Sequence, residues 1–360
     1  MTLPETFRFS QRSLQDYADC ARRFQLRYLL MQPWPALITD SPQAFEEHVA
    51  RGADFHRLAH QHALGIDAAR LAETIDDESL ARWWQIFLSR PPAGLPETVR
   101  RAEVVLTAPA PGPSGPEAGP EAEKADDAMG NGPETGPRAR EETGPGAREE
   151  TGPSSLSESV RSNGFSRPKA TEAATTNENR SLLRQPARAG EETGQGAGYR
   201  LVAKFDLLAA EPGERLVVVD WKTVLKQPRR QHLVRRLQTT VYRYLAVEAG
   251  ADYFGGQRPG PEQVEMVYWF ANHGGAVERF PYDAAQHAVA REELAGMVAE
   301  IDARQETIWP LTSDERHCRF CNYRSLCERG VRAGFLEDLE EDVEPAEIEI
   351  NLEQIAEVEF

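Results

Sequence analysis

Leu216-Val217-Val218-Val219-Asp220-Trp221-Lys222 is the stretch that decides the fold of this 360-residue chain. A run of four aliphatic residues is typical of a buried strand, and this one ends on an acid and an amine. A second acid, Asp206, stands fourteen residues before Asp220 in another apolar run. Because side chains alternate along a strand, Asp220 and Lys222 are expected on the same face.

The loop between these two runs decides whether the acids meet. A two-residue turn at Pro212-Gly213 would set Asp206 opposite Val219 and move Asp220 to the other face. A loop centred on Gly213, or a bulge, would pair Asp206 with Asp220. Two carboxylates can share a metal ion only from one face, so we predict the odd-length loop.

Two stretches lack the composition of a folded domain. Residues 109 to 198 are dominated by Pro, Gly, Ala, Glu, Thr and Ser, which predicts a low-complexity, disordered insert. Residues 336 to 360 hold eleven acidic residues and no Lys or Arg, and form an acidic tail. Elsewhere acidic and basic residues nearly balance, so the net charge of −17 does not exclude a nucleic-acid partner. Residues 1 to 108 and 199 to 335 are expected to form one domain.

Hydrophobic periodicity predicts the elements around the acids. An apolar stripe that starts after a cap at Ser10 or Ser13 predicts one continuous helix to Tyr28, with Cys20 on it. The insert joins the first two predicted strands, so we expect it at a hairpin tip. The whole pattern predicts a mixed α/β domain. Further helices are predicted at about 42 to 64, 77 to 89, 229 to 249 and 284 to 304, and strands at 103 to 107, 200 to 208, 215 to 221, 264 to 270 and 277 to 281.

The compartment bears on the four cysteines. No apolar stretch is long enough to cross a membrane, and the N-terminus lacks the regions of a signal peptide, so we expect a cytoplasmic protein with no membrane partner. Thiols stay reduced there, which favours ligands over disulfides. Four thiolates suit Zn2+ or an iron–sulfur cluster, and either would tie the first helix to the C-terminal segment. The four are Cys20, Cys318, Cys321 and Cys327.

The acids and the basic residues near them suggest a chemistry. Mg2+ held by Asp206 and Asp220 would neutralise a phosphodiester and make a water nucleophilic, while Lys222 would stabilise developing charge. His56 is a candidate extra ligand. It stands four residues before His60, but the Glu of a zinc-protease motif is absent. The segment after the acids carries the basic residues Lys226, Arg229, Arg230, Arg235, Arg236 and Arg243, with Gln238 and Tyr242 one helical turn apart, and these could contact phosphates and a base.

Together these residues resemble the PD-(D/E)xK nuclease superfamily, and specifically its RecB-like branch with an iron–sulfur staple. That branch includes the C-terminal nuclease domain of AddB subunits and CRISPR-associated adaptation nucleases. The residues that carry the resemblance are Ser13-Leu14, Tyr17, Cys20, Phe24, His56, Asp206, Asp220-Trp221-Lys222, Gln238, Tyr242 and the three late cysteines.

The resemblance implies a restriction-endonuclease-like core, with a mixed, largely antiparallel sheet flanked by helices and closed by a cysteine-ligated cluster. It makes His56, Asp206 and Asp220 ligands of Mg2+ or Mn2+, and Lys222 the catalytic lysine. It assigns Gln238 and Tyr242 to DNA contact, where we add Arg235 and Arg236 from the basic segment. It also favours a structural [4Fe-4S] cluster over Zn2+.

Three functions compete. The leading one is a metal-dependent deoxyribonuclease, an exonuclease on ends or single strands, acting in DNA repair, recombination or CRISPR adaptation. No G-x4-G-K-[ST] loop occurs, so unwinding would come from a partner such as a helicase, and a CRISPR adaptation protein is the other expected partner. The alternatives are a DNA-binding module that does not cleave, and an iron–sulfur redox or sensor protein.

Overall fold

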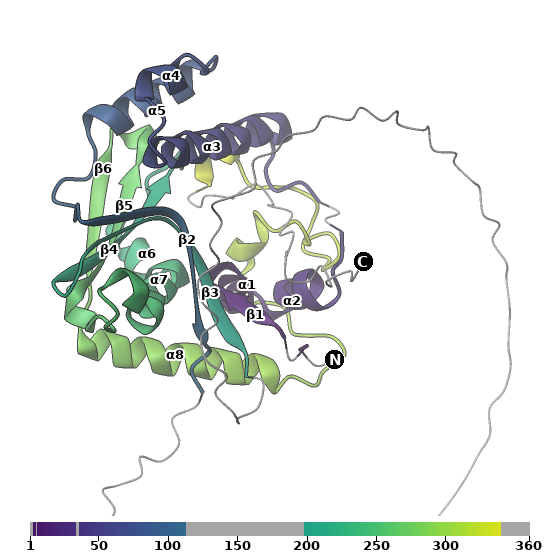
Figure 1. Cartoon of the computed structure of the whole chain (residues 1–360). Coiled ribbons are helices and arrows are strands. Elements are labelled where there is room, and N and C mark those ends of the chain that lie inside the picture. The colour runs from purple at the N-terminus through teal and green to yellow at the C-terminus, as the bar shows by residue number, and fades with distance from the viewer. Residues whose placement is uncertain (1–2, 5, 34–35, 113–197, 340–360) are drawn as a thin grey trace, which may run out of the picture. The chain divides into compact units, whose positions relative to one another are not determined.

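The computed structural model describes residues 3–4, 6–33, 36–112 and 198–339 (Figure 1). The chain divides into two units, Met1–Ala118 with Gln195–Phe360, and Gly119–Gly194. The second unit lies outside the described residues, as do nearly all of the predicted insert and the acidic tail from residue 340. None of the described helices is long and apolar enough to cross a membrane.

The described part of the first unit contains a mixed sheet of six strands in the order β1-β3-β4-β5-β6, with β2 paired to β3. Strands β1 and β3, and β4 and β5, pair in parallel, and the other three pairs are antiparallel. The mixed sheet agrees with the prediction, although β1 was not predicted and β2 and β3 are longer than expected. The strands are β1 Arg8–Ser10, β2 Val99–Pro109, β3 Arg200–Glu211, β4 Arg215–Lys222, β5 Val264–Phe270 and β6 Ala276–Pro281.

Helices cover both faces of this sheet (Figure 1). Three of the predicted helices occur as expected, at α3, α5 and α8, while α4 was not predicted. Short 3-10 turns lie at Ala251–Tyr253, Pro261–Gln263, Ala271–His273, Glu315–Cys318 and Leu336–Asp338. The helices are α1 Gln11–Asp19, α2 Ala21–Phe24 continued by a π-turn at Gln25–Leu29, α3 Pro42–Ala63, α4 Ala68–Ala72, α5 Glu78–Ser89, α6 Arg230–Arg235, α7 Leu237–Ala249 and α8 Ala284–Asp302.

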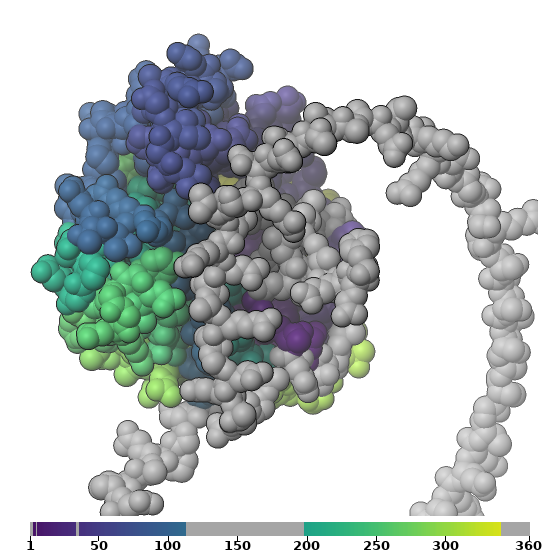
Figure 2. Space-filling model, viewed as in Figure 1, coloured from purple at the N-terminus to yellow at the C-terminus, as the bar shows by residue number. Residues whose placement is uncertain are grey.

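Alternation along β4 builds two cores. Leu216 and Val218 join the larger core with residues of α1, α7 and α8. Val217, Val219 and Trp221 face the other way and join the smaller core with residues of α3, α4 and α5. These three helices lie together as one block in the space-filling view (Figure 2). An apolar run buried on both faces therefore explains the continuous Leu-Val-Val-Val sequence.

The predicted continuous helix through Cys20 is wrong. Ser10 caps α1 through a reciprocal capping box with Ser13, as the sequence suggests, but Cys20 is extended at φ −166° and ψ 110°. The backbone N–H of Arg22 donates to the carbonyl of Pro310 at 3.1 Å. This long-range bond starts a new helix, so Cys20 stands at a break.

The predicted helix 229–249 is also interrupted, at Arg236. Thr239 Oγ1 donates to the Leu233 carbonyl at 2.6 Å, and so occupies the acceptor that a continuous helix would offer to Leu237. The Leu237 N–H instead donates to Gln15 Oε1 at 3.4 Å. The result is two helices, α6 and α7, with Arg236 at the start of the second.

Candidate active site

Strands β3 and β4 pair from Glu211 opposite Arg215 to Leu207 opposite Val219. The connecting loop has three residues around Gly213, whose φ of 80° suits glycine. This confirms the predicted odd-length loop. The next pair in this register is Asp206 opposite Asp220, the point where β4 leaves β3.

Beyond this point the same edge of β3 pairs with β1, through residues 200–202. The sheet therefore opens between β1 and β4, and we call Asp206 with Asp220–Lys222 the strand fork. Glu103, opposite Asp206 on β2, has a φ of 56°, so the neighbouring strand is distorted at the same level. Backbone distortion of this kind is common beside functional sites.

Where the pairing of β3 with β4 ends, the Asp206 side chain accepts a backbone hydrogen bond from β4 in place of the strand ladder. Its Oδ2 accepts the backbone N–H of Trp221 at 2.7 Å, and its Oδ1 lies 3.1 Å from His56 Nδ1. Burial alone would raise the pKa of Asp206, but the charge and hydrogen bond of His56, the Trp221 N–H and the charge of Lys222 together lower it. The carboxylate is therefore ionised, and His56 donates to it.

Asp220 is held by a residue of its own strand and by a residue of α7, which packs on the other face of the sheet from α3. Its Oδ2 lies 2.7 Å from Lys222 Nζ, and both side chains are only 6% exposed. Its Oδ1 accepts Gln238 Nε2 at 2.8 Å. Lys222 is thus the shared partner of the fork, since it pairs with Asp220 and its charge also lowers the pKa of Asp206.

Sequence reasoning missed Tyr268 and Thr239, which complete this network. The Tyr268 hydroxyl donates to Gln238 Oε1 at 3.3 Å and lies 2.8 Å from Thr239 Oγ1. Burial is the main reason that the pKa of Tyr268 rises to about 12, so the phenol stays protonated. A signal was present: Tyr268 is a phenol within an apolar strand, and in the β4–β5 register it stands opposite Asp220.

Helix α3 brings His56 to the fork by a close approach. A Cβ added at Gly52 would lie 2.9 Å from Thr223 Oγ1, one residue past Lys222. Gly52 therefore lets α3 approach the end of β4, and His56 follows one turn later. Phe55 on the same helix stacks on Trp269 of β5 with ring centroids 5.8 Å apart, which fixes the helix against the sheet.

The predicted DNA-contact residues have other roles in this geometry. Tyr242 is only 4% exposed, its hydroxyl donates to the Lys204 carbonyl at 2.9 Å, and its ring packs edge-on against Phe205. Gln238 is buried and positions Asp220, so its DNA contact, like that of Tyr242, stays a prediction. Arg235 is exposed and Arg236 half-buried.

Arg243 does not belong to the predicted basic surface. It is 8% exposed and donates to the carbonyls of Thr239 and Pro281, with its guanidinium 4.6 Å from the Tyr282 ring centroid. Burial lowers its pKa, and hydrogen bonds within the fold satisfy its donors. The Arg243 guanidinium thus connects α7 to the end of β6.

The four cysteines form no disulfide and line one small cavity. Burial, together with the neighbouring thiolates of Cys321, Cys20 and Cys318, raises the pKa of Cys327 to about 11. Burial likewise raises the pKa of Cys318 and Cys321, each with a contribution from Cys20. The break after α1 and the 318–327 segment thus bring residues from the two ends of the domain together.

No metal-binding group of three or more His, Cys, Asp or Glu is formed among the residues that the structure describes, either at the fork or at the cysteines. The donor chemistry at the fork still fits a divalent cation. Mg2+ characteristically takes one or two carboxylates and completes its shell with waters and substrate phosphate, rather than a cage of protein ligands. Asp206 and Asp220 supply that minimum, and a third ligand from His56 stays a prediction.

Comparison with known proteins adds one finding. The family model of the PD-(D/E)XK nuclease superfamily matches residues 8–111 and 138–328, which includes every residue of the strand fork. No curated protein matches the chain.

Proposed function

Because the chain belongs to the PD-(D/E)XK nuclease superfamily, whose members are typically hydrolases that use divalent metals such as Mg2+, we propose that it is a Mg2+- or Mn2+-dependent deoxyribonuclease. We place it in the RecB-like branch, as an exonuclease on ends or single strands. Repair, recombination or CRISPR adaptation is the proposed setting, with a helicase or an adaptation protein as partner and the cytoplasm as location.

The observation that carries this proposal is the convergence of two carboxylates and a buried amine at one break in the sheet. Asp206 and Asp220 face each other in the register of β3 and β4, and Lys222 pairs with Asp220 while its charge helps to lower the pKa of Asp206. Asp206 and Asp220 would hold the cation, with His56 as the proposed additional ligand. When bound, such an ion neutralises phosphate charge and lowers the pKa of a water.

Each residue of the fork then has a task. The Lys222 amine has little access to bulk water, and a positive charge in such a place acts most strongly on an approaching phosphate. Gln238 keeps one oxygen of Asp220 oriented by donating to it. The Trp221 N–H orients Asp206, while the Trp221 side chain anchors β4 in the smaller core.

We further propose that Cys20, Cys318, Cys321 and Cys327 hold a [4Fe-4S] cluster, with Zn2+ as the alternative. The support is that four thiols from the two ends of the domain line one cavity and raise one another's pKa. None of the residues that line this cavity belongs to the fork, which favours a structural role. A cluster there would join α1 to the 318–327 segment.

The proposed activity is tested with the full chain, purified anaerobically, on end-labelled single-stranded and duplex DNA with Mg2+ or Mn2+. Asp220→Asn should slow cleavage by about 10^3-fold, as expected when a charged group that stabilises the transition state is lost. Asp252→Asn, an exposed acid elsewhere on the surface, is the matched control and should cleave normally. Wild-type cleavage that survives Asp220→Asn would overturn the assignment of the site.

The same assay separates the alternative of a DNA-binding module. If wild type binds DNA but cleaves neither substrate with either ion, the fork is a structural feature of a binding protein. The observation that favours this alternative is that each acid already has protein partners, His56 and the Trp221 N–H for Asp206, and Lys222 and Gln238 for Asp220. A metal ion would have to compete with these contacts.

A further inference from the structure

Basic side chains surround the small cavity that the four cysteines line. Arg23, Arg324 and Arg329 line it together with His317, and no Asp or Glu is among the described residues that do so. A buried cation is costly unless a negative group compensates its charge. The partners of these four side chains therefore indicate which charge the cavity itself has to supply.

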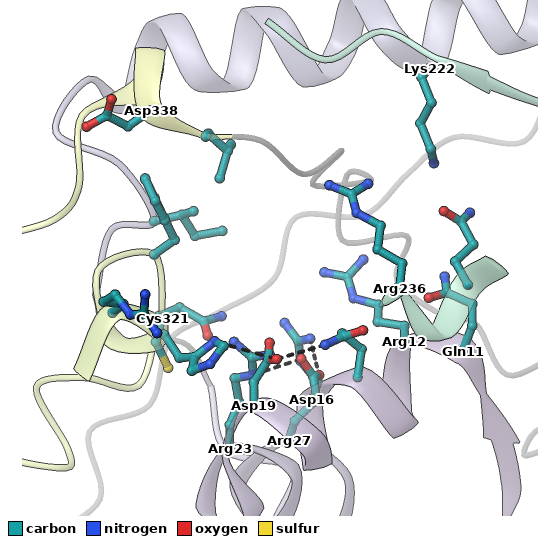
Figure 3. A pocket seen from close by; sticks show the side chains of 18 residues that line it. Gln11, Arg12, Asp16, Asp19, Arg23, Arg27, Lys222, Arg236, Cys321 and Asp338 are labelled. Atoms are coloured by element: carbon teal, nitrogen blue, oxygen red, sulfur yellow. Dashed lines mark hydrogen bonds and ion pairs between the residues drawn. The ribbon is translucent and has the colours of Figure 1, made fainter. Parts of the chain in front are cut away.

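Three of the four side chains are compensated from outside the cavity. Figure 3 shows Arg23 joined to two carboxylates of α1, with Cys321 beside this group. The ion pairs are Arg23 with Asp16 and Asp19, Arg329 with Glu315, and His317 with Asp19 and Asp314. None of these carboxylates lines the cavity, so each pair is complete without the cysteines.

Arg324 lacks such a compensation. Its side chain is buried, with 2% of the residue exposed, and it forms no ion pair with any described residue. Nη1 donates to the Cys321 carbonyl at 2.9 Å and Nη2 to the Val331 carbonyl at 3.3 Å, while the buried Nε has no hydrogen-bond partner in the described part of the chain. Carbonyl oxygens satisfy N–H donors but bring no net charge. Arg324 is therefore a buried cation that still requires an anion.

The thiol of Cys321 receives a hydrogen bond from the same turn. The backbone N–H of Tyr323 donates to Cys321 Sγ at 3.4 Å. A hydrogen bond to sulfur favours the negatively charged form of the ligand. Arg324 follows Tyr323 in the chain and binds the carbonyl of the same cysteine. Two consecutive residues thus place an N–H donor and a positive charge at Cys321.

A metal bound by the four cysteines would bring the missing negative charge. Cysteine binds metals as the thiolate, and four thiolates carry twice the charge of the Zn2+ that they would hold. A [4Fe-4S] cluster on four thiolates is likewise anionic. We propose that Arg324 supplies the counter-charge of the metal–thiolate centre of Cys20, Cys318, Cys321 and Cys327. The inference rests on the proposed cluster or zinc ion, is independent of nuclease activity, and assigns a positioning role to a residue that is not a ligand.

The competing role for Arg324 is to shape the loop. Its two hydrogen bonds join the carbonyls of Cys321 and Val331, and such a link needs donors in the right geometry rather than a charge. Arg324→Gln keeps N–H donors and removes the charge, whereas Arg324→Lys keeps the charge and removes the planar fork. A counter-charge therefore predicts that Lys behaves like Arg and that Gln does not.

The first test is the rate at which the full chain, purified anaerobically, loses its metal to an excess of chelator. Bathophenanthroline reports iron and 4-(2-pyridylazo)resorcinol reports zinc. Arg324→Gln should release metal about 10-fold faster, because loss of an outer partner of a metal site typically costs at least that much in affinity. Arg324→Lys should stay close to wild type. Arg332→Gln, an exposed arginine of the same segment that does not line the cavity, is the matched control and should change nothing.

Where the bound metal is an iron–sulfur cluster, its reduction potential gives a second test that a loop-shaping role would not move in a charge-dependent way. Reduction adds a negative charge, which a neighbouring cation stabilises. Arg324→Gln should therefore change the ratio of oxidised to reduced cluster about 10-fold at a fixed potential, a potential lower by about 59 mV for a one-electron couple. Arg324→Lys should restore the wild-type value.

The outcomes keep this inference apart from the metal site on which it rests. Metal-loaded Arg324→Gln that releases metal at the wild-type rate would overturn the counter-charge and leave the staple standing. Equally fast release from the Gln and Lys variants, or loss of metal from both during purification, would assign Arg324 to loop shape and also overturn it. Wild type with neither iron nor zinc would remove the staple and the counter-charge together.

Discussion

The strand fork and the cysteine cavity are built by different means. At the fork, regular strands fix the backbone, and neighbouring backbone and side-chain groups already bind both carboxylates. At the cysteines, Cys20 stands in a helix break and the other three lie in a short 3-10 segment and the irregular turns that follow it, where burial is the main cause of the raised thiol pKa values. The fork is thus held by the fold, whereas the cysteine segment would be held by the proposed cluster or zinc ion.

This contrast has a physical basis in secondary structure. Strand register transmits a loop length directly into which side chains face each other, so a sequence can specify a strand site with few residues. In turns, loop length does not determine in this way which side chains face each other. Ligand residues in turns are held in place by the ligand itself, which is why metal binding and folding are coupled in such segments.

The largest expected effect tests the fork half of this comparison. Lys222→Met removes one partner of a buried ion pair, leaving Asp220 without its counter-charge, and should destabilise the fold by about 3–5 kcal/mol. Single-turnover cleavage should fall about 10^2 to 10^3-fold. Denaturant unfolding and cleavage rates measured on the same preparation check both effects.

Lys222→Arg provides the control for this substitution. It keeps the charge, so it should recover most of the stability while the bulkier guanidinium still impairs cleavage. If Lys222→Met were as stable and as active as wild type, the fork would not be the pre-built polar site described above.

The next effect tests the cysteine half. Cys20→Ala removes the one thiol from the N-terminal end of the domain. It should lower Tm by about 10 °C and the free energy of unfolding by about 3 kcal/mol, with loss of bound metal. Iron, sulfide and zinc assays on anaerobically purified wild type and variant check it. Iron and sulfide in wild type support the cluster, zinc alone supports the alternative, and wild type without either metal contradicts the staple.

A smaller effect comes from Asp16, beside the cysteine segment. Burial would raise its pKa, but Arg23, Arg27 and Arg12 outweigh burial and lower it. A lowered folded pKa means that this carboxylate stabilises the protein above its unfolded pKa of about 3.9 and that the contribution is lost as pH falls through the lower folded value. Asp16→Asn should therefore cost about 2 kcal/mol near pH 7, with the difference shrinking below about pH 4.

Urea unfolding of wild type and Asp16→Asn from pH 3 to 7 measures this difference. A stability gap that stayed constant down to pH 3 would mean that the carboxylate's charge does not hold Arg23 and Arg27 in place. The buried contacts of Asp16 with the two arginines would then depend on the shape of the side chains and not on their charge.

The smallest effect examines the outer part of the fork network. Tyr268→Phe removes the hydroxyl that donates to Gln238 and should cost about 1 kcal/mol and slow cleavage a few-fold. Tyr282→Phe is a matched control, because the Tyr282 hydroxyl is buried without a hydrogen-bond partner in the described part of the chain. Equal behaviour of the two variants would show that the Tyr268–Gln238 link does not position Asp220.

The sequence predicted the fork well because its information is local. The apolar run of β4, the acid–amine spacing and Gly213 lie within a few residues of one another, and together they imply the observed register. The predictions that failed concerned helices whose breaks involve distant partners. The helix break at Cys20 is made with Pro310, and the one at Arg236 leaves the Leu237 N–H bound to Gln15.

The same reasoning explains the missed site residues. Tyr268 and Thr239 belong to no recognised motif, and their place beside Asp220 and Gln238 arises only when β5 and α7 are packed against β4. The predicted surface role of Arg243 failed for a related cause, since periodicity does not reveal that a cation will satisfy carbonyls within the fold.

The central claim is that Asp206 and Asp220 share one divalent ion at the strand fork. Anomalous diffraction from crystals of the protein soaked in Mn2+ tests it most directly, because it locates the metal without relying on activity. The account predicts one manganese peak in contact with carboxylate oxygens of both residues, which disappears in Asp206→Asn. Manganese bound elsewhere with none at the fork, or a peak that persists in the variant, would contradict it.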